Sequence, residues 1–200
     1  MAPHRFVPEE SALVVVDMQN AFLDPGIRFR YAPAALDIVD PINDLARWFR
    51  AAGSQVVWVR TTSRPDPADW PSLRRLLGEE AMDFRTEVLA EGAPGQAMWP
   101  GMDIAPQDHV VRKYRYSAMV EPDGELQALL EEHGTRMLYV AGTQTNICCE
   151  STARDAMMLG HDAVLVSDCL AAETPELHDA SLASYASAFG GVVSSAQVTA

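Results

Sequence analysis

Residues 137–159 read M-L-Y-V-A-G-T-Q-T-N-I-C-C-E-S-T-A-R-D-A-M-M-L, and they predict a strand, a tight turn and a helix in succession. The apolar run at 137–141 suits a buried strand, and Gly142 interrupts it. The next four residues, Thr-Gln-Thr-Asn, are typical of a turn and of a helix N-cap. A helix is then expected over 146–159. This unit carries a pair of adjacent cysteines into the first helical turn.

Two interpretations of this cysteine pair are open from the stretch alone. The first turn of a helix has unpaired backbone N–H groups and the positive end of the helix dipole. A thiolate is stabilised at such a place, so Cys148 or Cys149 could act as a nucleophile. Alternatively, both are packing residues of a core helix, because cysteine is among the most frequently buried residue types. Cys169, near the end of a later strand, is expected to be a buried thiol.

The rest of the chain alternates strands and helices in the same manner. Apolar runs predict strands at 12–16, 55–60, 109–113, 136–141, 163–167 and 192–195. Helical spacing predicts helices at 34–52, 73–77, 79–90, 121–133, 146–159 and 175–189. This alternation predicts an α/β fold of three layers, α/β/α, whose central, mainly parallel sheet has about six strands. No linker or repeat divides the chain, so we expect one domain over residues 1–200.

Three residues with reactive side chains follow strands of the predicted sheet. Asp17 ends the first strand, Lys113 ends the third, and Cys148 follows the fourth. Ligands of open α/β sheets bind beyond the carboxyl ends of the strands, so the three side chains are expected at one edge. A carboxylate or an ammonium at the end of an apolar strand is costly to bury without a partner. Each residue alone could be a loop residue or part of a structural ion pair, but together they suggest a reactive site.

Three sequence motifs are spread over most of the chain. They are V-V-D-M-Q-N-A-F at 15–22, K-Y-R-Y-S-A at 113–118 and G-T-Q-T-N-I-C-C-E-S-T-A-R-D-A at 142–156. With them the chain resembles the isochorismatase-like cysteine hydrolases, a superfamily that includes nicotinamidases, N-carbamoylsarcosine amidohydrolases and ureidoacrylate amidohydrolases. The second and third motifs look most like the ureidoacrylate amidohydrolase branch.

The resemblance implies a cysteine-dependent amidohydrolase with Asp17, Lys113 and Cys148 as catalytic residues. Cys148 would attack the carbonyl of a small amide, ureido or carbamoyl compound, and Asp17 would accept the thiol proton. A thioester would form with release of ammonia or an amine, and water would then hydrolyse it. The resemblance also implies an oxyanion hole made by the backbone N–H groups of Gln144 and Cys148, and a cis peptide bond between Thr143 and Gln144. Cys149 then becomes a packing residue.

Five residues are candidates for substrate binding, namely Gln19, Phe22, Trp70, Tyr116 and Ser117. The aromatic candidates could equally belong to the core. Arg64, Arg112 or Arg115 could hold a substrate carboxylate through two hydrogen bonds, although each could also be a solvated surface residue. Residues 61–107 hold six prolines and are too long for a plain connection, so we expect this segment to cover or line a site.

Composition narrows the classes of partner. The net charge of -13 makes nucleic acid and anionic membranes improbable partners. The resemblance implies a small-molecule substrate. Three cysteines, two of them adjacent, make a poor disulfide framework. With no signal-peptide pattern and no apolar run of membrane-span length, a cytoplasmic protein is expected. The resemblance implies a homo-oligomer.

No metal or other cofactor is expected. Nicotinamidases of the superfamily carry an Asp-x-His metal motif after the second strand, where this chain reads V-R-T-T-S-R at 59–64. Two alternatives to an amidohydrolase stay open. One is vinyl ether hydrolysis of the isochorismatase type, although isochorismatases proper lack the nucleophilic cysteine. The other is a non-catalytic binding or redox-sensing protein, although adjacent cysteines do not easily close a relaxed disulfide.

Overall fold

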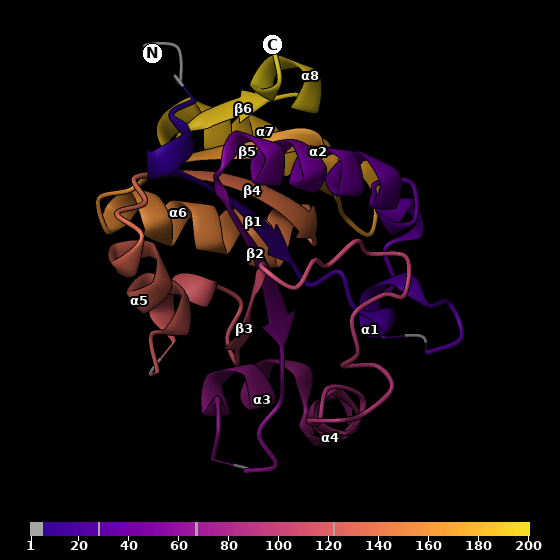
Figure 1. The fold of residues 1–200 in the computed structure, drawn as a ribbon. Helices are drawn as coiled ribbons and strands as arrows, with labels where there is room; N and C mark the ends of the chain where they lie inside the picture. Colours follow the sequence, from indigo (N-terminus) through magenta and orange to yellow (C-terminus); the bar gives the residue numbers. More distant parts are fainter. Residues whose placement is uncertain (1–5, 28, 67, 122) are drawn as a thin grey trace.

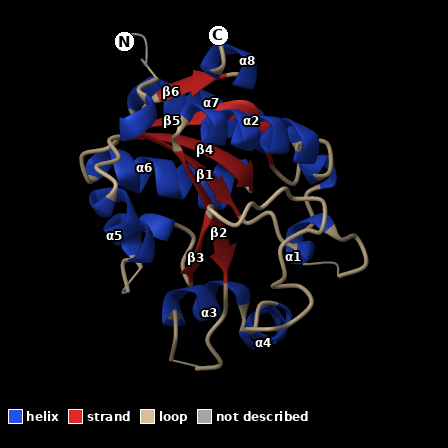
Figure 2. Cartoon of the chain, in the orientation of Figure 1, coloured by secondary structure: helices blue, strands red, loops and turns tan. Residues whose placement is uncertain are grey.

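A computed structural model describes residues 6–27, 29–66, 68–121 and 123–200, and its centre is one parallel sheet (Figure 1). The six strands lie in the order β3-β2-β1-β4-β5-β6, and every neighbouring pair is parallel. Helices flank the sheet in Figure 2, which confirms the predicted α/β/α fold. The strands are β1 (Ser11–Val16), β2 (Gln55–Thr61), β3 (His109–Lys113), β4 (Met137–Thr143), β5 (Asp162–Ala171) and β6 (Gly191–Val193).

The helices follow the strands in most of the expected places. The α-helices are α1 (Asn20–Leu23), α2 (Val39–Ala52), α3 (Pro71–Leu77), α4 (Glu79–Val88), α5 (Glu125–Glu132), α6 (Glu150–Met158), α7 (Pro175–Ala188) and α8 (Ser195–Val198). Short 3-10 helices are η1 (Pro8–Glu10), η2 (Pro33–Ala35) and η3 (Ala118–Val120). A π-helical turn, η4 (Thr145–Cys149), precedes α6.

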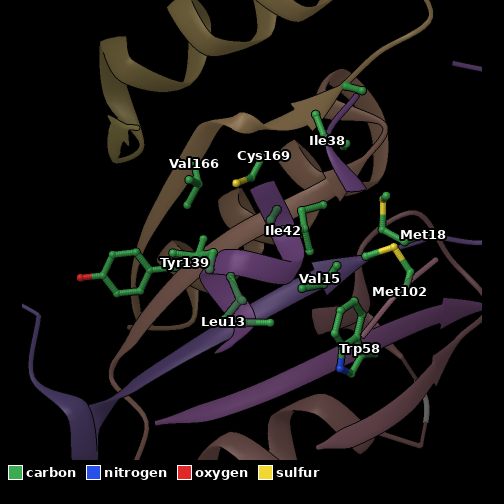
Figure 3. Close-up of a cluster of buried hydrophobic side chains, with 14 of the residues drawn as sticks. Leu13, Val15, Met18, Ile38, Ile42, Trp58, Met102, Tyr139, Val166 and Cys169 are labelled. Atoms are coloured by element: carbon green, nitrogen blue, oxygen red, sulfur yellow. The ribbon is translucent and has the colours of Figure 1, made fainter. Parts of the chain in front are cut away.

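The central strand contributes to a hydrophobic core on each face of the sheet, because successive strand residues point to opposite faces. Leu13 and Val15 pack with α2, whereas Val14 and Val16 pack with α5, α6 and α7. All four side chains are fully buried. Figure 3 shows the core that contains Leu13 and Val15. Cys169 lies in this core and is the buried thiol that the sequence predicts.

The order of the strands fixes where a ligand can bind. The first strand, β1, lies in the middle of the sheet. The chain then adds β2 and β3 on one side of it and β4, β5 and β6 on the other. The carboxyl ends of β1 and β4 therefore flank the point at which the direction of winding reverses, where ligands of such folds bind. Figure 1 shows α3 and α4 beyond the carboxyl ends of β2 and β3. This part of the 61–107 segment thus covers the same edge of the sheet.

The structure differs from the sequence expectation mainly at the ends of elements. The helix predicted at 121–133 begins only at Glu125, after Gly124 in a left-handed conformation. The last strand ends at Val193, so the prediction of strand at 194–195 was wrong. Ser194 instead caps α8, since its hydroxyl accepts a hydrogen bond from the backbone N–H of Gln197. A serine followed three residues later by glutamine is a capping box, which competes with extended structure.

Gly142 allows β4 to approach β1 closely. It pairs with Val16 and has a φ of 110°, a conformation that L side chains rarely adopt. A Cβ atom on Gly142 would lie 2.0 Å from the carbonyl oxygen of Val16. Any side chain here would therefore push apart the two strands that flank the winding reversal.

We expect Gly142→Ala to lower the free energy of unfolding by about 3–5 kcal/mol, from backbone strain together with the clash against Val16. Gly53→Ala is the matched control, because Gly53 also has a positive φ of 83° but a Cβ atom there would meet nothing within 4 Å. That variant should lose only about 1–2 kcal/mol. Urea denaturation measures both losses, and equal losses would contradict the close-approach argument.

Candidate active site

Asp17, Lys113 and Cys148 meet at the carboxyl edge of the sheet, as their positions after the strands predict. The Nζ atom of Lys113 lies 2.8 Å from Oδ2 of Asp17 and 3.3 Å from Sγ of Cys148. Asp17 and Lys113 are fully buried, and Cys148 is 8% exposed. The three groups thus form a carboxylate–ammonium–thiol cluster, with Lys113 in contact with both partners.

The backbone and Thr61 hold the Asp17 carboxylate in place. Asp17 follows β1 with a φ of 53°, an uncommon conformation for a residue other than glycine. Its Oδ1 atom accepts hydrogen bonds from the backbone N–H of Thr61 at 3.1 Å and from the Thr61 hydroxyl at 2.8 Å. The Thr143 hydroxyl donates to the Asp17 carbonyl oxygen at 2.8 Å. Contacts from β2 therefore orient the carboxylate, with Oδ2 directed to Lys113, and the contact from β4 holds the Asp17 backbone.

The Lys113 ammonium is enclosed by oxygen and sulfur atoms. Besides Asp17 and Cys148, it contacts the Thr61 hydroxyl and the carbonyl oxygen of Arg115. Burial disfavours the charged form, but attraction to Asp17 and Cys148 outweighs it, so the pKa of Lys113 lies above its ordinary value. A protonated lysine beside an aspartate is the expected resting state of this pair.

The surroundings of the Cys148 thiol disfavour its ionisation, in contrast to the thiolate that a helix N-terminus would stabilise. Burial is the largest influence and raises the pKa of Cys148 to about 12. The Lys113 ammonium acts to lower this pKa, whereas the charge of Asp17 and its hydrogen bond act to raise it. The residue also lies in the π-helical turn rather than in α6. The thiol therefore needs a base, and Asp17 is next to it.

The neighbouring Cys149 is not among the residues that line the cavity. It is fully buried in the core with α6 and α7, and its thiol lies 3.8 Å from the Ala141 carbonyl oxygen. Burial raises the pKa of Cys149 well above its ordinary value. Cys149 is thus the packing residue that the sequence motif predicts.

A small cavity of about 40 Å³ opens over the cluster. Apolar side chains and several cationic ones surround it. The residues that line it are Phe22, Phe29, Arg30, Thr61, Leu77, Arg85, Leu89, Lys113, Arg115, Tyr116, Gln144, Ile147 and Cys148. Cys148 is among these lining residues, so its side chain borders the space that a ligand would enter.

Of the five predicted substrate-binding residues, Phe22 and Tyr116 line the cavity. The other three have side-chain contacts elsewhere. The Gln19 side chain is fully buried and exchanges hydrogen bonds with the backbone N–H and carbonyl of Thr61 at 2.8 and 2.9 Å. The Trp70 ring packs edge-on against Tyr116 with 4.7 Å between centroids. The Ser117 hydroxyl accepts a hydrogen bond from the Met119 N–H at 3.1 Å.

Sequence reasoning did not identify several residues that line the cavity. Phe29 and Arg30 come from the loop after α1, and Arg85 and Leu89 come from the end of α4. These segments lack the hydrophobic periodicity that would fix their orientation. Of the proposed arginines, only Arg115 lines the cavity, and it pairs with Asp69 at 2.8 Å.

Gln144 carries two features of interest beside the cluster. The peptide bond between Thr143 and Gln144 is cis, as the sequence resemblance implies. Both Gln144 and Cys148 line the cavity. The Gln144 side chain donates a hydrogen bond to the Arg30 carbonyl oxygen at 2.7 Å and so ties the turn to the loop after α1.

In the described part of the chain, no group of three or more histidine, cysteine, aspartate or glutamate side chains is arranged to hold a metal ion. None of the helices described has the length and apolar character needed to cross a membrane.

Known proteins resemble this chain over nearly its whole length. A family model described as the isochorismatase domain matches residues 11–197. The ureidoacrylate amidohydrolase RutB of Acinetobacter baylyi is 30% identical over 94% of this chain and 82% of its own length. A cysteine hydrolase from Pseudomonas syringae pv. phaseolicola has a TM-score of 0.87 and 29% identity, over 97% of this chain and 92% of that one. The N-carbamoylsarcosine amidase of Thermoplasma acidophilum has a TM-score of 0.73 and 27% identity, over 93% and 96% of the two chains.

Alkylation of Cys148 by iodoacetamide tests its protonation state. Because the pKa of Cys148 is about 12, the rate should rise about tenfold per pH unit between pH 7 and 10, without a plateau. Asp17→Asn should speed alkylation at a given pH, since Asp17 raises this pKa. Peptide mass spectrometry identifies the labelled residue, and unlabelled Cys149 and Cys169 show that the variant is folded. A plateau below pH 8 would mean that the resting thiol is already ionised.

Proposed function

This chain belongs to the isochorismatase family, and we propose that it is a cysteine-dependent amidohydrolase that cleaves the C–N bond of a small amide, ureido or carbamoyl compound. The observation that carries the proposal is the cluster itself, in which Lys113 lies 2.8 Å from Asp17 and 3.3 Å from the Cys148 thiol at the base of a cavity. The names of the relatives, ureidoacrylate amidohydrolase and N-carbamoylsarcosine amidase, support chemistry at a carbon–nitrogen bond.

Asp17 serves as the general base in the first step. The thiol proton of Cys148 moves to the carboxylate as Sγ attacks the carbonyl carbon. Proton transfer moves the negative charge from the carboxylate to the sulfur, and attack then moves it to the carbonyl oxygen. The Lys113 ammonium stays in contact with Asp17 and Cys148 throughout. The total charge of the buried cluster does not change, so the step avoids creating an uncompensated charge in the interior.

Backbone N–H groups of Gln144 and Cys148 stabilise the oxyanion that forms on the carbonyl oxygen. Both residues line the cavity beside the thiol, which supports this role. In comparable sites the loss of one such donor raises the barrier by roughly 3–4 kcal/mol. Gln144 is tied to Arg30 through its side chain, so the turn is held before a substrate arrives.

Collapse of the tetrahedral intermediate completes the first half of the reaction. The C–N bond breaks, the proton on Asp17 passes to the leaving nitrogen, and ammonia or an amine departs. The acyl group remains on Cys148 as a thioester, or as a thiocarbamate when the substrate is a ureido compound. A water molecule then gives a proton to Asp17 and attacks the acyl carbon, and the proton returns to the sulfur as the C–S bond breaks.

The observed contacts favour this function over the two alternatives. Vinyl ether hydrolysis of the isochorismatase type does not use a cysteine, whereas Cys148 faces the cavity and contacts Lys113. A redox function of the adjacent cysteines would need both thiols to react together, but Cys149 is fully buried in the core. A homo-oligomer and a cytoplasmic location stay predictions of the sequence.

Cys148→Ala should reduce ammonia release by more than about 1,000-fold, because it removes the nucleophile. The matched variant Cys149→Ala should keep most of the activity, since Cys149 only packs in the core. The substrates to compare are simple amides, ureido acids, carbamoyl amino acids and nicotinamide, with ammonia as the readout. Equal losses in the two variants would refute the assignment of Cys148. Undiminished turnover in Cys148→Ala would instead favour chemistry without the thiol, and isochorismate would be the next substrate to test.

A further inference from the structure

The lining of the cavity is cationic although the chain as a whole is acidic. Four of the described residues that line it are basic, namely Arg30, Arg85, Lys113 and Arg115. No aspartate or glutamate is among the described lining residues. The whole chain, in contrast, has a net charge of -13. A local excess of positive charge in an acidic protein indicates a ligand that carries negative charge.

Three of these four cations already have an acidic partner. Lys113 pairs with Asp17, Arg30 pairs with Glu173 at 3.2 Å, and Arg115 pairs with Asp69 at 2.8 Å. Arg85 differs from them, because no ion pair links it to an acidic side chain within the ranges that the structure describes. It is therefore the cation most able to bind an anionic group of a ligand.

Neutral groups hold the Arg85 side chain in place. Arg85 lies on α4 and is 7% exposed. Its Nη1 atom donates a hydrogen bond to the Ser63 hydroxyl at 2.6 Å, and its guanidinium carbon lies 5.5 Å from the centroid of the Trp70 ring. Trp70 in turn packs against Tyr116, another lining residue. The guanidinium is thus positioned at the cavity wall without compensation of its charge.

Such an arrangement is costly unless an anion completes it. A guanidinium stays protonated in proteins, so Arg85 cannot escape the cost of burial by losing its proton. Burial lowers the pKa of Arg85, while Cys148, Tyr116 and Asp17 act in the opposite direction. These influences agree with a position of Arg85 near the reactive end of the cavity. A buried cation of this kind is stabilised when a ligand brings a negative charge to it.

We propose that Arg85 binds a carboxylate of the substrate, so that this protein acts on small ureido or carbamoyl acids in preference to neutral amides. The inference rests on the proposed amidohydrolase function, which it makes more specific. Arginine suits the task because its planar guanidinium binds a carboxylate through two parallel hydrogen bonds. The carbonyl of the same substrate would lie at Cys148, which lines the same cavity.

A matched pair of compounds tests the proposal in the unmodified enzyme. The pair is 3-ureidopropanoate and its methyl ester, which differ in the charge of one group. Wild-type protein should release ammonia from the acid with a kcat/KM at least about 10-fold higher than from the ester. This comparison needs no variant, so it stays decisive even if substitution of Arg85 disturbs folding. Hydrolysis of both compounds at equal rates, or a preference for the ester, would overturn the proposal.

Variants of Arg85 then assign the preference to this residue. Arg85→Gln should lower kcat/KM for the acid about 100-fold, mainly through KM, and change the value for the ester less than about threefold. Arg85→Lys should recover part of the loss. The control is Arg75→Gln, which removes the same charge from an exposed position of neighbouring α3 and should leave both rates unchanged. A similar loss for acid and ester in Arg85→Gln would show a structural role instead.

Calorimetric titration separates this proposal from the proposed function. The Cys148→Ala variant should bind 3-ureidopropanoate more tightly than the ester, and Arg85→Gln in the same background should remove the difference. If wild-type protein hydrolyses neither compound while this binding pattern appears, the amidohydrolase proposal fails and the carboxylate site stands. If neither compound binds, or both bind equally, the carboxylate site fails whatever the protein hydrolyses.

Discussion

The ion pair between Asp17 and Lys113 is the interaction on which the rest of this site depends. Both side chains are fully buried and their charged atoms lie 2.8 Å apart. Removing two charges from water is costly, and the attraction between them compensates only when geometry and additional hydrogen bonds are favourable. Thr61 supplies these bonds, since it donates to Asp17 from its backbone and its hydroxyl and also contacts Lys113. The carboxyl ends of β1, β2 and β3 are thereby joined by one polar network.

In the proposed mechanism, that network allows a buried thiol to become a nucleophile. Burial raises the pKa of Cys148 to about 12, so an isolated thiol in this place would be inert. Contact with Lys113 offsets the negative charge that would develop on the sulfur, and the adjacent Asp17 can take the proton. The close approach of β4 to β1 at Gly142 brings the turn that carries Cys148 to this pair. The fold and the proposed reactivity therefore depend on the same few contacts at the point where the winding of the sheet reverses.

The sequence predicts the sheet and the cluster because both follow from patterns with a fixed physical meaning. Apolar runs mark the strands, and parallel strands bring their carboxyl ends to one edge, so the sequence alone groups Asp17, Lys113 and Cys148. The protonation state of Cys148 could not be predicted in this way. A helix N-terminus favours a thiolate, but the extent of burial that opposes it is set by packing across several elements. Arg85 was missed for a related reason, since the 61–107 segment lacks a clear periodicity and the arginine becomes distinctive only through its surroundings in the folded chain.

Rapid-quench mass spectrometry tests most directly whether Cys148 forms a covalent bond to the substrate, as the proposed mechanism requires. The substrate of choice is an activated amide whose amine leaves easily, so that hydrolysis of the acyl-enzyme limits turnover and the intermediate accumulates. The proposed mechanism predicts a burst of about one equivalent of amine per protein molecule. The peptide that contains Cys148 should gain the mass of the acyl group during that burst. Linear release of amine without a burst, with Cys148 unmodified throughout or the acyl group on another residue, would contradict this mechanism.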